Sequence, residues 1–110
     1  MPLTTHVLDL VHGKPAAGLE LRLLRDGHDP IEAVTNVDGR CDAALLADLG
    51  VGRYRLEFEV GAYFRRQGLA LAEPAFLETV VIDFGVSDPG QHHHVPLLVS
   101  PFGYSTYRGS

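Results

Sequence analysis

The clearest pattern in this sequence is Tyr54-Arg55-Leu56-Glu57-Phe58-Glu59-Val60, in which apolar and charged side chains alternate without exception. Successive side chains of a β-strand point to opposite faces of a sheet. This alternation therefore predicts a strand with one face in the core and the other in solvent. The rest of the chain must then supply the strands that pair with it and a layer that covers its apolar face.

Four more stretches have the character of strands. Apolar residues fall on both faces of residues 5–11, and they recur at every second position in 19–23, 80–86 and 95–99. Turn signals that contain glycine separate these stretches at 12–18, 26–27, 37–39 and 88–90. Short strands between such turns predict an all-β fold, either a sandwich or a barrel.

Three local features depart from this pattern. Residues 62–67 lack the alternation and precede Gly68, which predicts a short helix with a glycine cap at its C-terminus. Residues 43–49 fit either one helical turn or a loop. Pro96 has no backbone N–H, so it is expected at a sheet edge, at a bulge, or with its nitrogen facing away from a neighbour. An edge strand rich in valine and leucine would also be a site for pairing with another subunit.

Length and composition limit the classes of protein. The 110 residues, 45% of them hydrophobic, are expected to form one domain over residues 1–110. The net charge of −5 argues against a nucleic-acid partner, and the basic pair Arg65-Arg66 is interpreted as a solvated face. No apolar run reaches the roughly 18 residues of a membrane span, and the first residues do not resemble a signal peptide. We therefore expect a cytoplasmic protein with no membrane partner, and the lone Cys41 is interpreted as a structural thiol.

Histidines are the most frequent candidates for chemistry. Six occur, and three of them are consecutive: His92, His93 and His94. In a strand His92 and His94 share a face and could hold a metal ion, but no further ligand pattern completes such a site. His92 and His93 are instead interpreted as exposed residues between a loop and a strand.

His94 and His6 lie inside predicted strands, on the faces of Leu98 and Leu8 respectively. With Arg40, which follows a predicted turn, these two imidazoles are candidates for one pocket. Imidazole exchanges protons near neutral pH, and a guanidinium binds carbonyl or enolate oxygens through its planar fork. From the residues alone, a structural role for each histidine is the alternative.

The sequence carries neither the G-x-S-x-G elbow nor a Cys-His motif of covalent hydrolases, and it has no glycine-rich phosphate loop. The carboxylates Glu78 and Asp83 have no evident partner and are interpreted as solvated. A hydrolase with this sequence would therefore activate water directly, with acid–base help, rather than form a covalent intermediate.

Five motifs carry a resemblance to a known family. They are Leu3-Thr4-Thr5-His6-Val7-Leu8-Asp9, Gly13-Lys14-Pro15-Ala16, Thr35-Asn36-Val37-Asp38-Gly39-Arg40, His94-Val95-Pro96-Leu97-Leu98 and Tyr104-Ser105-Thr106-Tyr107-Arg108-Gly109-Ser110. Together they resemble the 5-hydroxyisourate hydrolase family, the transthyretin-related enzymes of urate breakdown. The resemblance spans nearly the whole chain, and the closing Tyr-Arg-Gly-Ser is specific for the enzymes as against transthyretin itself. Family members often carry tyrosine where His93 and Phe102 stand.

The resemblance implies a transthyretin-like β-sandwich of two four-stranded sheets with one short helix. It also implies a homotetramer, built as a dimer of dimers, with active sites in the cleft between dimers. By motif matching, His6, Arg40, His94 and the tail 107–110 would line that cleft. The implied reaction opens a ring amide of 5-hydroxyisourate to give 2-oxo-4-hydroxy-4-carboxy-5-ureidoimidazoline, without a metal or an organic cofactor.

The resemblance also suggests roles for these residues. One imidazole would deprotonate water, the other would protonate the leaving nitrogen or hold its partner's tautomer, and Arg40 would stabilise negative charge. Tyr107 and Ser110 would complete the wall, and Arg108 would pair with a carboxylate to fix the tail. The alternative is a transthyretin-like carrier of a small ligand without catalysis; a metal-binding domain built on 92–94 is the weakest reading.

Overall fold

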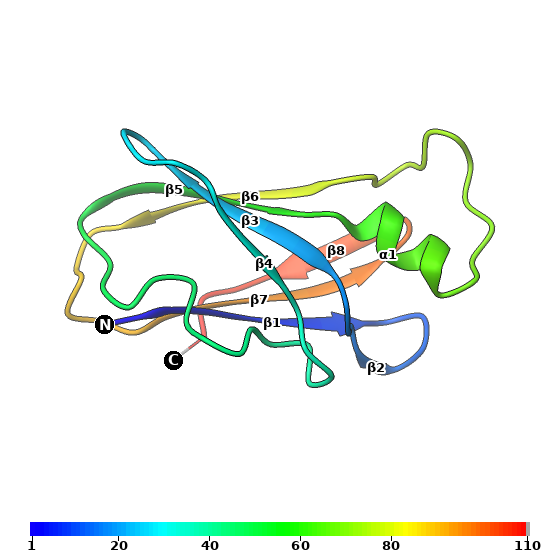
Figure 1. Cartoon of the computed structure of the whole chain (residues 1–110), viewed down its shortest axis with the longest axis horizontal. Coiled ribbons are helices and arrows are strands. Elements are labelled where there is room, and N and C mark those ends of the chain that lie inside the picture. The colour runs from blue at the N-terminus through cyan, green and yellow to red at the C-terminus, as the bar shows by residue number, and fades with distance from the viewer. Residues whose placement is uncertain (110) are drawn as a thin grey trace.

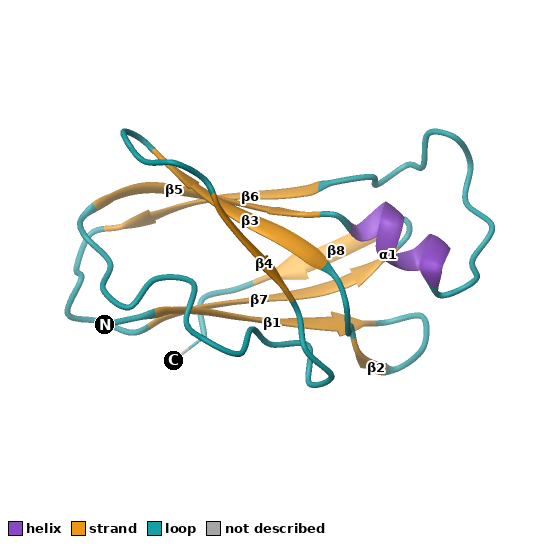
Figure 2. Cartoon of the chain, viewed as in Figure 1, coloured by secondary structure: helices purple, strands orange, loops and turns teal. Residues whose placement is uncertain are grey.

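The fold consists of strands in two layers. In this computed structural model, residues 1–109 are described, and they form two four-stranded sheets with one short helix at one end (Figure 1, Figure 2). The first sheet has the order β2-β1-β7-β8, with β1 (Leu3–Asp9), β2 (Lys14–Pro15), β7 (His93–Ser100) and β8 (Gly103–Thr106). The second has the order β4-β3-β5-β6, with β3 (Glu20–Arg25), β4 (Ile31–Val34), β5 (Gly52–Phe58) and β6 (Val80–Val86). The predicted all-β sandwich is confirmed.

The core lies between the two sheets, and the alternation of the strands supplies it. In β5 the buried side chains are Tyr54, Leu56 and Phe58, while Arg55 faces solvent. The first sheet contributes side chains that are also buried, namely Leu3, Val7, Val95, Leu97 and Val99. Fully burying an aliphatic or aromatic side chain contributes about 1.5–3 kcal/mol, so these two apolar faces hold the layers together.

The helix α1 spans Val60–Arg66, two residues earlier at its start and one earlier at its end than predicted. Val60 is buried and continues the alternation of β5, so the sequence pattern does not separate the end of the strand from the start of the helix. The strand in fact ends at Phe58, and Glu59 occupies the N-cap position of the helix without a side-chain capping hydrogen bond. Gly68 has φ of +91°, which confirms the predicted glycine cap after the last turn.

A buried carboxylate joins the helix to the first sheet. Asp9 is 1% exposed, and its Oδ2 accepts hydrogen bonds from the Tyr63 hydroxyl and from His12 Nδ1, both at 2.7 Å. Its Oδ1 accepts from the backbone N–H groups of Val11 and His12, which ends β1 at this residue. Burial alone would raise the pKa of Asp9, but the donors of His12 and Tyr63 together hold it below its ordinary value.

Residues 43–49 are a loop rather than a helical turn. The loop is fixed to the first strand by backbone hydrogen bonds from Leu45 N to Leu3 O and from Leu3 N to Leu46 O, both of 3.0 Å. These bonds form an isolated bridge between Leu3 and Leu46, so the backbone groups of this apolar segment are satisfied by a strand instead of by helical neighbours.

Of the three placements considered for Pro96, the structure excludes the sheet edge. β7 lies inside the first sheet, between β1 and β8. Its pairing with β8 runs from Leu97 to Ser100 and stops one residue short of Pro96. The Pro96 carbonyl accepts a hydrogen bond of 2.8 Å from the Thr106 hydroxyl, so the end of β8 meets the proline without requiring an N–H from it.

Two charged residues that were interpreted as solvated form an ion pair instead. Arg65 Nη1 donates to Glu78 Oε2 at 3.0 Å, and Arg65 Nη2 donates to Glu78 Oε1. The hydrogen bonds from Arg65, and then the one from the backbone N–H of Ala75, lower the pKa of Glu78 to about 2.

Among residues 1–109, no helix is long and apolar enough to cross a membrane.

Candidate active site

The pairing of β1 with β7 brings the two candidate histidines to one surface. These strands are parallel, and their register places Thr4 opposite His94 and His6 opposite Pro96. In β1 the residues Leu3, Thr5 and Val7 face the core, so Thr4 and His6 lie on the other face of the sheet. His94 is also half-buried, between buried neighbours in β7. His6 and His94 therefore share the outer face of the first sheet, as predicted.

A tight turn holds Arg40 beside this sheet. The side-chain oxygen of Asn36 accepts hydrogen bonds from the N–H groups of Asp38 and Arg40, at 2.9 and 3.2 Å. Gly39 is buried with φ of +75°, and its carbonyl accepts a hydrogen bond of 2.8 Å from Val7 N in β1. The conformation favours glycine, and an added Cβ would collide with the Val7 carbonyl. The turn thus fixes the start of the Arg40 side chain against the centre of β1.

The tail lies directly over His94. Gly109 N donates to the His94 carbonyl at 2.7 Å, and Gly109 is buried. A Cβ at Gly109 would lie 2.7 Å from Cδ2 of the His94 ring, which is closer than carbon atoms approach one another. Arg108 Nη2 donates to Gln91 Oε1 at 2.7 Å, so its partner is an amide and not the expected carboxylate. Tyr107 is 60% exposed, and the Ser110 prediction lies outside the described residues.

His94 is the histidine whose surroundings are most clearly specialised. Its Nδ1 lies 2.8 Å from the Thr4 hydroxyl. Burial lowers the pKa of His94, and the positive charge of Arg40 and then the charges of His92 and His6 lower it further. A neutral imidazole beside a guanidinium can accept a proton from water while the guanidinium holds an anionic oxygen.

The histidine run does not form the metal site that was considered. His93 points into the core at 4% exposure and donates from Nδ1 to the Gln91 carbonyl at 2.9 Å, so the prediction that it is exposed is wrong. Period-two alternation explains this result, because His93 shares the face of Val95 and Leu97 in β7. In the part of the chain that the structure describes, no group of three or more His, Cys, Asp or Glu side chains could hold a metal ion.

The sequence reasoning missed two residues of this site, Thr4 and Gln91. Thr4 touches both His94 and His92, and Gln91 holds Arg108. Thr4 stands one residue before the predicted strand 5–11, while β1 begins at Leu3. Extending the predicted strand by one residue would have placed Thr4 on the face of His6. Cys41 is half-buried, and burial followed by the charge of Asp42 raises the pKa of its thiol, which suits a structural role.

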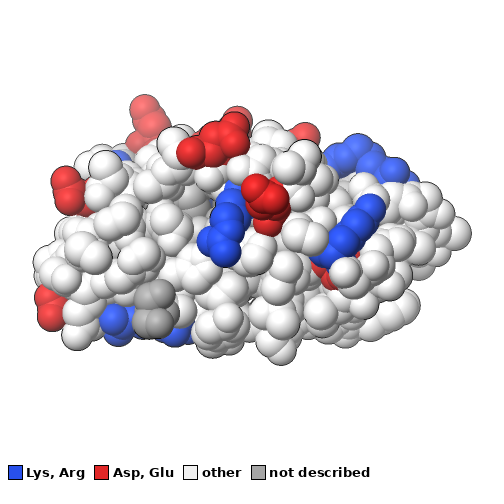
Figure 3. Space-filling view, turned by 90° about the horizontal axis from the view of Figure 1, so that it is seen from below, with Lys and Arg blue, Asp and Glu red and all other residues white. Residues whose placement is uncertain are grey.

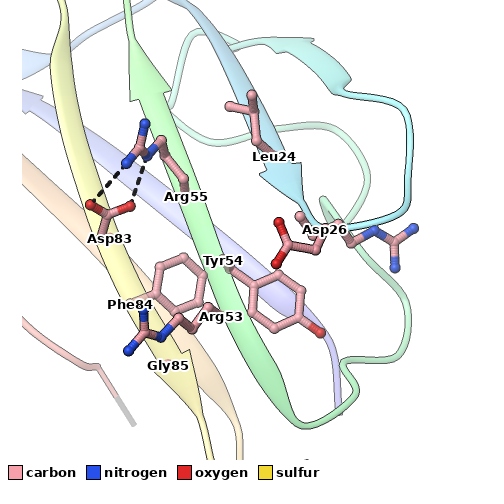
Figure 4. Close-up of a pocket in the computed structure, with 9 residues that line it drawn as sticks. Leu24, Asp26, Arg53, Tyr54, Arg55, Asp83, Phe84 and Gly85 are labelled. Carbon is pink, nitrogen blue, oxygen red and sulfur yellow. Dashed lines mark hydrogen bonds and ion pairs between the residues drawn. The ribbon is translucent and has the colours of Figure 1, made fainter.

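A separate groove of about 740 Å³ lies on the second sheet (Figure 4). It is lined by the adjoining parts of β3, β5 and β6, and Arg55 Nε donates to Asp83 Oδ1 there at 2.8 Å. Asp83, interpreted as an unpartnered solvated residue, thus has a partner. None of the predicted site residues within 1–109 lines this groove, so it is not the candidate site.

Comparisons with known proteins agree with this arrangement. The model of the HIUase/Transthyretin family matches residues 3–109. The 5-hydroxyisourate hydrolase of Caulobacter vibrioides is 55% identical over 98% of this chain and 97% of its own. The structure of Klebsiella pneumoniae 5-hydroxyisourate hydrolase has a TM-score of 0.84 at 41% identity, over 99% of this chain and 93% of that one. Sea bream transthyretin in complex with thyroxine has a TM-score of 0.82 at 32% identity, over 97% of this chain and 93% of that one.

Proposed function

Because this chain belongs to the HIUase/Transthyretin family, we propose that it hydrolyses 5-hydroxyisourate to 2-oxo-4-hydroxy-4-carboxy-5-ureidoimidazoline. The observation that carries the proposal is that His6 and His94 share one sheet face, with Arg40 in a turn beside them and the tail over His94. The carrier alternative is not favoured, because relatives that are hydrolases share more of the sequence than the thyroxine-binding transthyretin does.

The lowered pKa of His94 supports the first step of the proposed mechanism. His94, neutral at neutral pH because its pKa is lowered, takes a proton from water, and the oxygen attacks a ring carbonyl of the substrate. Arg40 holds the oxygen on which negative charge develops. His6 then supplies a proton to the departing ring nitrogen. Each of the three groups performs a different step, so each is needed for turnover.

The tail forms the wall of the proposed site. Gly109 is held to the His94 backbone and Arg108 to Gln91, and these contacts support a tail that is ordered against the catalytic face. Tyr107 and Arg108 bind polar edges of the substrate in this proposal. Ser110 is assigned a catalytic role by motif matching alone, since it lies outside the described residues.

Assembly into a homotetramer, with active sites between dimers, belongs to the same proposal. Phe76 and Phe102 are 74% and 79% exposed and their rings lie 6.1 Å apart, so together they offer aromatic surface that a second copy can cover. β6 and β8 lie at sheet edges, where strands of a second copy can pair. Figure 3 shows the molecule from below, and much of the surface in this view carries no charged residues. Such a surface suits burial against another subunit.

Three further statements complete the proposal. The chain works as one domain over residues 1–110, it acts in the cytoplasm, and it needs neither a metal nor an organic cofactor. Cell fractionation tests the location. A chelator is expected to leave the hydrolysis rate unchanged, and loss of activity that added metal restores would contradict the cofactor-free reaction.

The decisive experiment generates 5-hydroxyisourate with urate oxidase and follows its ultraviolet decay with and without this protein. His6→Ala, Arg40→Ala and His94→Ala are each expected to slow turnover by about 10²-fold or more, because each removes an acid–base or electrostatic group. Arg22→Ala, on the opposite sheet, is the matched control and is expected to retain activity. A wild-type protein that does not accelerate the decay at micromolar concentration would refute the proposed function.

A further inference from the structure

The Thr4 hydroxyl lies between two imidazoles. Its oxygen is 2.8 Å from Nδ1 of His94 and 3.3 Å from Nε2 of His92, and the two ring centres are 6.3 Å apart. A hydroxyl has one proton to donate, so it donates to one of these nitrogens and accepts from the other. The tautomers of the two rings are therefore linked through Thr4.

Each of the two arrangements gives His94 a different function. If Thr4 donates to His92, it accepts the Nδ1 proton of His94, and Nε2 of His94 carries a free lone pair. If Thr4 donates to His94, then His92 donates to Thr4, and Nε2 of His94 carries a proton. Only the first arrangement lets His94 act as a base toward water.

The structure assigns Thr4 as a positioning residue that donates to His92 and thereby holds His94 as the tautomer protonated at Nδ1, with its Nε2 free to accept a proton. The two contacts come from the geometry, whereas the choice between the two arrangements rests on the proposed function, in which His94 is the base. When Nε2 takes a proton from water, the Nδ1 proton passes to Thr4 and the Thr4 proton passes to Nε2 of His92. The water oxygen keeps the electron pair for its bond to carbon, and His92 ends as imidazolium.

The surroundings of His94 favour this transfer. Burial disfavours a charged His94 ring, and Arg40, His92 and His6 act in the same direction. A hydrogen bond to the Thr4 backbone raises the pKa of His94, but the net shift is still downward. Passing the proton on returns His94 to its neutral form. Thr4 lies on the outer face of β1, so its side chain does not pack in the core between the two sheets. The Thr4 hydroxyl is therefore available to both rings.

The test uses Thr4→Val, which keeps the branched shape, and Thr4→Ser, which keeps the hydroxyl. Long-range ¹H–¹⁵N spectra of the imidazoles report the tautomer of His94 in the complete protein without substrate. We expect the Nδ1–H tautomer in the wild type and in Thr4→Ser, and a mixture in Thr4→Val and in His92→Ala. Thr79→Val removes a hydroxyl bonded to Glu59 next to the start of β6, in the second sheet, and is the matched control.

The kinetic result should follow the spectra. Thr4→Val is expected to lower kcat by at least about tenfold with little change in KM, and Thr4→Ser to recover most of it. An Nε2–H tautomer in the wild type, or a tautomer that Thr4→Val leaves unchanged, would overturn the assignment. A wild type that does not hydrolyse 5-hydroxyisourate refutes the proposed function instead, and the spectra still decide the role of Thr4.

Discussion

Gly109→Ala is expected to remove most of the catalytic activity while the sandwich stays folded. The new Cβ would lie 2.7 Å from His94 Cδ2 and 3.2 Å from His94 Cβ, whereas carbon atoms in contact stay about 3.5–4.0 Å apart. Either the tail or the imidazole must therefore move by about 1 Å. A displacement of about 1 Å at a reacting group costs on the order of 10²-fold, so we expect kcat/KM to fall by about that factor.

The cost to stability is expected to be small. The substitution can break one backbone hydrogen bond, from Gly109 N to the His94 carbonyl. Such a bond contributes about 1 kcal/mol to the free energy of unfolding. Ultraviolet decay of 5-hydroxyisourate gives the activity, and urea unfolding at fixed protein concentration gives the stability. Gly50→Ala is the matched control, since its new Cβ meets only the Tyr54 hydroxyl at an ordinary 3.9 Å. A folded Gly109→Ala variant that retains more than about a third of the wild-type kcat/KM would refute the close contact as a catalytic requirement.

Three further results are expected. Tyr63→Phe removes a donor from the buried carboxylate of Asp9 and should lower the free energy of unfolding in urea by about 2 kcal/mol. Tyr54→Phe is the control: its hydroxyl bonds only backbone groups, so the loss should be about 1 kcal/mol. A larger loss for Tyr54→Phe than for Tyr63→Phe would contradict the role given to Asp9. Burial and a neighbouring arginine lower the pKa of His94 below 6.5, so unfolding takes up a proton below that pH. The free energy of unfolding of the wild type should therefore fall relative to that of His94→Gln as the pH drops below about 6.5. If the two proteins lose stability in parallel with falling pH, His94 does not have the lowered pKa. Gly39→Ala should lower the free energy of unfolding by about 2 kcal/mol or more, because Gly39 has φ of +75° and the Val7 carbonyl of β1 blocks the new Cβ. Thermal unfolding measures this loss, and an unchanged melting temperature would contradict the prediction.

The sequence predicted where most strands lie better than where one element ends and the next begins, or which strands pair. Alternation in 54–60 and 80–86 located two paired strands, because one face of each strand must be apolar. The same alternation ran on into Val60, which the structure places in the helix. The position of β7 inside a sheet depends on its parallel pairing with β1, and no local pattern encodes which distant strands pair.

The candidate site shows the same limit. Residue chemistry selected His6, Arg40 and His94, and the structure brings them together. The link between Thr4 and His94 was missed because it depends on the register of two strands about 90 residues apart. His93 was misplaced because a polar residue was assumed to be exposed, although one hydrogen bond to the Gln91 carbonyl makes its burial acceptable.

The parallel pairing of β1 with β7 also has a consequence during synthesis of the chain. A ribosome that has released residues only through β6 has delivered Thr4, His6 and Arg40, but neither His94 nor Gly109. The first sheet then lacks both β7 and β8, so the proposed site cannot assemble on the growing polypeptide. If the proposed site residues are correct, hydrolytic activity requires translation beyond β7. A chain terminated before β7 would then be inactive even if its second sheet had formed.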